Sequence, residues 1–232
     1  MTTMKKFGML LIVALTAVLG TGCDDTDGDY ARYAAFVTVE TLPGNDYYFR
    51  LDNDETAYPS DKSLVAGYRP EENGRALIYF DYDRRKKPEA EYDYNFKLYG
   101  IDDILTGDTR TVTTEEEAKA LPDNKTSYSG ANLNGNYLNV GVGFYATDYD
   151  LHSFTLVRND FEAPDAEHTQ EEYLNLELRH DAHGDTEGLH HWTYVSFPMD
   201  EFREALAEKR GIILRVSTYA NGVQYLRVDK GR

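Results

Sequence analysis

Residues 212–229 read IILRVSTYANGVQYLRVD, and they indicate the fold class of the C-terminal half of the chain. Two runs rich in β-branched and aliphatic residues flank Asn221-Gly222, the strongest short-range signal for a β-hairpin. Upstream, YLNLELRH (173–180) alternates leucines with polar residues, which is typical of a strand with one buried face. The sequence therefore predicts a C-terminal half built from strands.

Three more segments of this half have strand character: NYLNVGVGFYA (136–146), HSFTLVRN (152–159) and HHWTYVSF (190–197). Together with the segments above they make six strands with long connections. This number and spacing favour a sandwich of two sheets.

One or two short helices are expected among the strands. MDEFREALAEKRG (199–211) has apolar residues on one face, and Gly211 stands just past its end, where helices prefer glycine. TTEEEAKAL (113–121) offers Thr113 or Thr114 as an N-cap, with a glutamate three residues later, as in a capping box. We place this second helix in a connection, next to a domain boundary between residues 107 and 108.

The segment between residues 33 and 107 is also rich in strands. Its strand-like runs are AAFVTVET (34–41), DYYFRL (46–51), ETAYPS (55–60), GRALIYFDYD (74–83) and YDYNFKLYGIDDILT (92–106). Gly100 predicts a bend in the last of them. Five strands in about 75 residues are compatible with a small barrel.

The N-terminus has the pattern of an export signal. Lys5 and Lys6 precede the apolar run FGMLLIVALTAVLG, which is shorter than the roughly 20 residues that span a membrane. Small residues then lead to Cys23, the only cysteine. The pattern resembles a bacterial lipobox, although Gly20 stands where a large aliphatic residue is usual. We expect residues 1–22 to be a cleaved lipoprotein signal peptide, Cys23 to carry lipid, and residues 23–32 to form an acidic tether.

The net charge of the mature chain limits the classes of partner that it can bind. The formal net charge is −17, and removal of residues 1–22 takes away two lysines and no acids, so it becomes 22 − 41 = −19. This balance argues against nucleic acid, which needs lysine and arginine for its phosphates. The N-terminal lipid is thus the expected membrane contact. The acids after Cys23 resemble a surface-display signal of Bacteroidetes outer-membrane lipoproteins, and the periplasmic face is the alternative.

Histidines and acids cluster in RHDAHGDTEGLHH (179–191). Imidazole and carboxylate groups suit zinc, so the candidate metal ligands are His180, His183 and Asp185, with Asp181 and His190 beside them. No HExxH or paired Cys-His spacing supports a site. We expect a polar hairpin with neither metal nor cofactor. A metal-dependent enzyme would need three of these side chains to converge.

Catalysis has no candidate residues in this sequence. No GxSxG motif is present, Cys23 is expected to be lipidated, and 41 acids make any carboxylate pair uninformative. We therefore expect a binding protein and not an enzyme.

Candidate binding residues are tyrosines of the first half: Tyr47, Tyr79 and Tyr92. They either form a glycan-binding face or cover the core. A flat exposed platform would favour a glycan, and a wide patch of mixed polarity would favour a protein. The basic run Arg84-Arg85-Lys86-Lys87 is either a docking point or a solvated loop.

Several stretches together resemble the NigD-like family of Bacteroidetes lipoproteins: DYYFRLDNDETAYPS, RALIYFDYD, YNFKLYGIDDILT, NGNYLNVGVGF, LNLELRHDAHGD and WTYVSF. The resemblance covers residues 34 to 230. It implies an all-β chain with an OB-like barrel (33–107) followed by an immunoglobulin-like β-sandwich (108–232). The family takes its name from a nigrescin bacteriocin operon, from which the role of an immunity factor was inferred. It has no established catalytic residues.

The resemblance and the residues together lead to one leading function and one alternative. We expect a non-catalytic lipoprotein of the cell envelope that binds a macromolecular partner, with a bacteriocin-immunity-like role as its most specific form. The alternative is a glycan-binding accessory lipoprotein of an outer-membrane uptake system. The sequence names neither the partner nor the oligomeric state.

Overall fold

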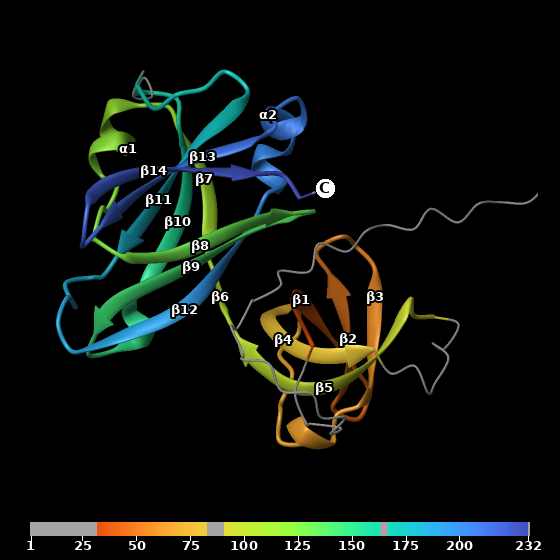
Figure 1. Cartoon of the computed structure of the whole chain (residues 1–232). Helices are drawn as coiled ribbons and strands as arrows, with labels where there is room; N and C mark the ends of the chain where they lie inside the picture. The colour runs from red at the N-terminus through yellow and green to blue at the C-terminus, as the bar shows by residue number, and fades with distance from the viewer. Residues whose placement is uncertain (1–31, 83–90, 163–166, 232) are drawn as a thin grey trace, which may run out of the picture. The chain divides into compact units, whose positions relative to one another are not determined.

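The computed structural model describes residues 32–82, 91–162 and 167–231. The signal peptide, Cys23, all but the last residue of the tether and the basic run 84–87 lie outside these ranges. The chain divides into two compact units between Asp103 and Ile104, slightly before the expected boundary, and each unit is described by itself (Figure 1). No helix among the described residues is long and apolar enough to span a membrane.

The first unit is a closed five-stranded barrel with the strand order β1-β2-β3-β5-β4. Its strands are β1 (Tyr33–Leu42), β2 (Asp46–Leu51), β3 (Thr56–Asp61), β4 (Gly74–Tyr82) and β5 (Tyr94–Asp103). β4 pairs with β1 and closes the barrel, while β3 and β5 run parallel. A single 3-10 turn, η1 (Ser63–Val65), lies between β3 and β4. The expected small OB-like barrel is confirmed.

Alternation along the strands builds the barrel core. In β2, every second residue is buried, in the order that DYYFRL predicts. Phe80 and Phe96 stack inside with ring centroids 3.8 Å apart. The expected bend in β5 is also present, because the register with β4 shifts between the Tyr79–Gly100 pair and the next. Glycine gives room there, since a Cβ on Gly100 would lie 3.1 Å from the Tyr79 ring, closer than an ordinary contact.

A buried ion pair ties the barrel together. Arg75 Nη1 of β4 lies 2.8 Å from Oδ1 of Asp52, which follows β2, and the two side chains are 2% and 3% exposed. The same Nη1 donates to the hydroxyl of Thr38 on β1 at 3.1 Å. A pair this deeply buried is costly to break, because the remaining buried charge would lose the opposite charge that compensates it.

The second unit is a sandwich of two sheets. The five-stranded sheet has the order β14-β13-β11-β10-β7, and the four-stranded sheet has the order β6-β12-β9-β8. The strands are β6 (Leu105–Thr106), β7 (Asp108–Val112), β8 (Ser127–Asn134), β9 (Tyr137–Ala146), β10 (Ser153–Asn159), β11 (Tyr173–Asp181), β12 (Leu189–Pro198), β13 (Gly211–Thr218) and β14 (Gly222–Asp229). The expected sandwich is confirmed.

In the part of the chain that the structure describes, the sandwich has nine strands, three more than the six that we expected. β6 is the end of the run 92–106, and it pairs with β12 of the second unit instead of extending the barrel. β7 and β8 lie in the segment that we expected to be a connection. β8 reads SYSGANLN, so its composition gives little strand signal, and pairing with β9 holds it in the sheet.

Both expected helices are present, and one is shorter than expected. α1 (Glu115–Lys119) begins with a capping box formed by Thr114 and Glu117. After the 3-10 turn η3 (Asp200–Phe202), α2 runs only from Arg203 to Ala207. The expectation that Gly211 ends this helix was wrong. Gly211 begins β13, where a Cβ would lie 2.1 Å from the Val228 carbonyl oxygen.

The hairpin around Asn221-Gly222 is confirmed, with a different turn. Thr218 pairs with Gly222, so Asn221 belongs to a three-residue loop, and Gly222 has the positive φ of +67°. The Thr218 hydroxyl donates to the Gly222 carbonyl at 2.8 Å. This longer loop carries Tyr219 out to the surface.

Candidate functional site

The histidine-rich segment does not form the expected hairpin. β11 lies in the five-stranded sheet and β12 in the four-stranded sheet, so the chain crosses from one sheet to the other between Asp181 and Leu189. Arg179 pairs with Glu177 and Asp123 and not with Asp181. Residues that are close in sequence are therefore placed on different sheets.

His180 is a buried structural residue. Its Nε2 lies 2.9 Å from Nδ1 of His152, its Nδ1 lies 3.3 Å from the Lys125 carbonyl oxygen, and its ring stacks on Phe154 at 4.5 Å. Burial, together with the neighbouring His152, lowers the pKa of His180 to about 4. Sequence reasoning missed His152, which lies 28 positions away along the chain.

The two other candidate ligands have separate structural roles. His183 is exposed, with a φ of 48°, and its backbone N–H donates to the Asp181 carboxylate at 2.9 Å. Asp185 Oδ2 accepts the backbone N–H groups of Thr147 and Asp148 at 2.8 and 2.7 Å, and these bonds lower the pKa of Asp185. Within the described ranges, no group of three or more His, Cys, Asp or Glu side chains could hold a metal ion.

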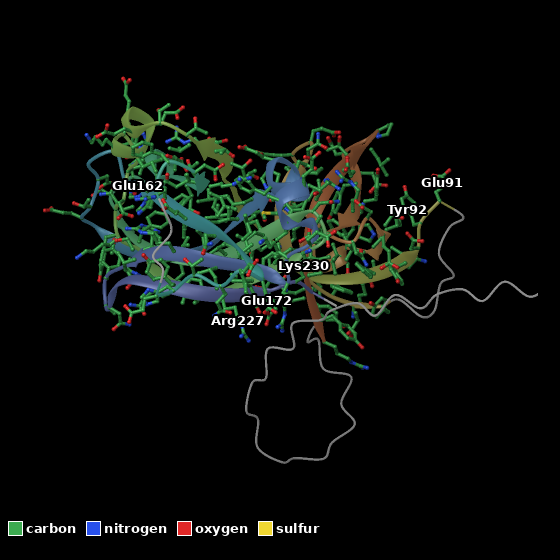
Figure 2. All side chains as sticks on the ribbon, turned by 90° about the horizontal axis from the view of Figure 1, so that it is seen from above. Glu91, Tyr92, Glu162, Glu172, Arg227 and Lys230 are labelled. Carbon is green, nitrogen blue, oxygen red and sulfur yellow. The ribbon has the colours of Figure 1, made fainter. Side chains whose placement is uncertain are left out.

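The candidate tyrosines of the barrel do not combine into an open platform. Tyr47 is 2% exposed and belongs to the barrel core, and Tyr79 is half-buried beside Gly100. Tyr92, labelled in Figure 2, stacks with Tyr58 at 5.4 Å and an angle of 25°, so the two rings cover each other's faces. The face that each ring turns to the other is not free to stack on a sugar.

An open hollow of about 390 Å³ lies beside η1 in the barrel, and Lys62 and Arg69 line it. Lys62 forms an ion pair with Asp46, and the Arg69 guanidinium donates to the carbonyl groups of Gly67 and Tyr68. The cations of this hollow are thus engaged locally, and its lining has no paired nucleophile and base.

The exposed aromatic side chains gather on the sandwich instead. We call Tyr145, His190, Trp192 and Tyr219 the aromatic patch. Trp192 is 58% exposed, Tyr145 42% and Tyr219 40%. Sequence reasoning missed the patch, although a signal was present: in HHWTYVSF, His190 and Trp192 alternate with residues that face the core.

Strand register positions the patch on the outer face of the four-stranded sheet. His190 of β12 pairs with Tyr145 of β9, and Trp192 pairs with Gly143. Because Gly143 has no side chain, the neighbouring rings can lie over the β9 backbone. A Cβ at Gly143 would be 2.6 Å from Cε1 of His190 and 3.0 Å from Cδ2 of Trp192. Phe144 points the opposite way, into the core.

The rings of the patch meet edge to face. Tyr145 and His190 are 4.9 Å apart at 72°, Tyr145 and Tyr219 are 5.4 Å apart at 80°, and His190 and Trp192 are 5.2 Å apart at 68°. His190 Nε2 also lies 3.1 Å from the Ser127 hydroxyl. Such crossed rings make a surface with relief and mixed polarity. A flat sugar-stacking platform would need nearly coplanar rings.

The comparisons with known proteins agree with the two units of the fold. A family model described as the NigD-like N-terminal OB domain matches residues 36–104, and one described as the NigD-like C-terminal beta sandwich domain matches residues 110–229. No curated protein is similar enough to the chain to match it.

Several solved structures share the fold at low sequence identity. A Bacteroides vulgatus protein of unknown function is 20% identical, with a TM-score of 0.69, and the match covers 86% of this chain and 90% of that chain. A NigD-like immunity protein of Bacteroides caccae is 18% identical, with a TM-score of 0.55 and coverage of 84% and 90%. A candidate lipoprotein of Bacteroides fragilis is 14% identical, with a TM-score of 0.56 and coverage of 86% and 97%.

Proposed function

The chain belongs to the NigD-like family, and from this premise we propose that it is a non-enzymatic envelope lipoprotein that binds a protein partner through the aromatic patch. The observation that carries the proposal is the exposure of Trp192, the only tryptophan of the chain, among other exposed apolar side chains on one sheet face. Exposed apolar residues that cluster in this way usually mark an interaction site.

The composition of the patch suits a protein–protein contact. Tryptophan and tyrosine are enriched among the residues that contribute most to such interfaces, and charged residues are depleted at their centres. The patch contains no Asp, Glu, Lys or Arg. Its crossed rings would pack into a surface of complementary shape, which the side chains of a protein can provide and a flat glycan chain cannot.

The N-terminus supplies the other half of the proposal. Lipid on Cys23 would hold the sandwich at the outer membrane, on its periplasmic or outer face, and tethering would raise the effective concentration of the patch for partners there. The most specific form of the proposal is an immunity-like role, in which the anchored chain captures an incoming bacteriocin. The family membership and the immunity description of the Bacteroides caccae neighbour support this form.

A photo-crosslinking experiment in living cells tests the proposed function. A benzoylphenylalanine at position 192 should give a discrete protein adduct after illumination. The matched control is the same group at Phe161, which is 44% exposed outside the patch and should give none. Absence of a protein adduct at 192 would overturn the proposal, and an adduct that consists of glycan would support the alternative of a glycan-binding accessory lipoprotein.

An immunity assay tests the specific form. Cells that carry the chain with Trp192→Ala should lose protection against the toxin to the same extent as cells without the chain. We expect the affinity for the partner to fall by about 2 kcal/mol or more, roughly 30-fold in Kd, because truncation of a central tryptophan typically costs this much. Full protection by the variant would show that the patch is not the capture site.

A further inference from the structure

Two acidic loops adjoin the aromatic patch. Residues 147–152 connect β9 to β10 through the 3-10 turn η2 (Tyr149–Leu151), and residues 182–188 connect β11 to β12. We call Asp148, Asp150 and Glu187, which are exposed, the acidic rim. The rim lies at the ends of β9 and β12, the strands that carry Tyr145 and His190, so it borders the patch.

The two loops are fastened to each other, so the rim has a fixed place. As described above, Asp185 of one loop accepts the backbone N–H groups of Thr147 and Asp148 in the other. Gly188 lies directly against β9, where a Cβ would be 2.3 Å from the Ala146 carbonyl oxygen. The position of the acids beside the patch therefore follows from backbone contacts and not from mobile side chains.

The two loops carry no lysine or arginine of their own, and the adjoining segment, in which Asn124 accepts the Ala182 backbone N–H, contributes one exposed lysine, Lys125. Residues 144–152 and 181–192 include five acids, namely Asp148, Asp150, Asp181, Asp185 and Glu187, and no lysine or arginine. Among the described residues, no lysine or arginine forms an ion pair with any of these five acids. The rim thus presents net negative charge beside an uncharged aromatic centre, in a chain whose total charge is also strongly negative.

From this arrangement we propose that the partner is a basic protein, which places an apolar anchor on the aromatic patch and lysine or arginine side chains against the acidic rim. This inference rests on the proposed function and names the chemistry of its partner. An interface of this kind has an apolar centre that contributes most of the affinity and a charged rim that steers association and selects partners. An acidic partner would meet like charge at the same rim and be rejected.

The first test uses the full-length lipoprotein in a non-ionic detergent, with Trp192 as the reporter. Quenching of its fluorescence by caesium, by iodide and by neutral acrylamide is measured below about 50 mM salt, where screening is weak. After normalisation to acrylamide, caesium should quench about two- to threefold better than iodide, because the rim concentrates cations. Equal quenching or stronger quenching by iodide would overturn the proposal.

The second test uses defined probes on the same protein. The peptide KFKFKFK should shift the emission of Trp192, and its apparent Kd should rise with salt, whereas the peptide EFEFEFE and maltoheptaose should leave the emission unchanged. The double variant Asp150→Asn/Glu187→Gln should weaken KFKFKFK binding about three- to tenfold. The control Glu116→Gln/Glu208→Gln makes the same charge change at two exposed acids outside the rim and should leave binding unaltered.

The outcomes separate the two proposals. If crosslinking at position 192 captures a protein and the probes show no preference for the basic peptide, the charge inference fails and the proposed function stands. If crosslinking captures no protein, the proposed function fails whatever the probes show. Preference for EFEFEFE or maltoheptaose would overturn the inference directly.

Discussion

Acidification should destabilise the sandwich through His180. In the folded chain, His180 is neutral: it accepts a hydrogen bond from one histidine and donates one to a backbone carbonyl. A proton on Nε2 would place a second donor in the His152–His180 contact of 2.9 Å unless His152 carried its own proton on Nε2, which lies 3.7 Å from the Asp185 carboxylate. Burial, which disfavours the charged imidazole, and the neighbouring His152 together hold the folded pKa of His180 at about 4, below its ordinary value of 6.5.

The sign and size of the effect follow from this difference. Between pH 6.5 and 4 the unfolded chain binds the proton and the folded chain does not, so the free energy of unfolding falls as the pH is lowered. The contribution of His180 is fully present above pH 6.5. Relative to that, the loss should be about 2 kcal/mol at pH 5 and about 3 kcal/mol at pH 4, since one pKa unit corresponds to about 1.36 kcal/mol.

Urea unfolding at pH 7, 6, 5 and 4.5, followed by fluorescence, measures this loss. Trp192 is the only tryptophan, so the signal reports the sandwich and is silent for the barrel. His180→Gln retains an acceptor for His152 and removes the titration, so its unfolding free energy should change much less with pH. His183→Gln is the surface control and should keep the slope of the parent chain.

Two results would refute the reasoning. One is an unfolding free energy of the parent sandwich that stays constant from pH 7 to pH 5. The other is a His180→Gln variant with the same pH slope as the parent, which would assign the slope to other groups. Asp185 acts at lower pH, because its depressed pKa contributes stability that is lost only as the pH falls below about 4.

Three further changes test other features of the structure. Gly143→Val should displace the ring of Trp192, destabilise the sandwich by about 1–3 kcal/mol and shift the tryptophan emission to the red. Arg75→Met should cost the barrel about 3–5 kcal/mol in circular-dichroism melts, because it removes the guanidinium that lies 2.8 Å from the buried carboxylate of Asp52, and Arg75→Met/Asp52→Leu should recover most of that loss. Cys23→Ala should move the protein out of the membrane fraction on cell fractionation.

Each of these three predictions has an outcome that would contradict it. An unchanged emission spectrum for the glycine variant would mean that the rings do not rest on β9. A double barrel variant no more stable than Arg75→Met alone would mean that the lost energy is packing and not uncompensated charge. Membrane retention of the cysteine variant would remove the lipid anchor from the proposed function.

Local signals in the sequence were sufficient for most of the fold. Period-two alternation located the strands of the barrel, the glycine in β5 marked its bend, and Thr114 marked the start of α1. These features depend on neighbours within a few positions. The partner of β6 and the presence of β8 did not follow, because both depend on pairing with distant strands and their own composition is weak.

The candidate site was harder to predict for the same reason. The segment 179–191 places several histidines near one another in sequence, but the crossing between sheets puts His180 on one sheet and His190 and His191 on the other. His180 finds its partner in His152, outside that segment. In the aromatic patch, Tyr145 of the four-stranded sheet contacts Tyr219, which follows β13 of the five-stranded sheet. No short sequence pattern predicts such a contact.

The pairing of the sandwich strands also bears on how the chain reaches its folded state. β6 pairs with β12 at Leu105–Val195, a separation of 195 − 105 = 90 residues, and β11 pairs with β13 across the whole of β12 and α2. Proteins dominated by such distant pairings fold slowly, because the entropy of closing long loops is lost before the distant strands make stabilising contacts. Slow assembly of the sheets would suit the export that we propose for this chain, since it would leave time for an unfolded chain to pass through a translocation channel.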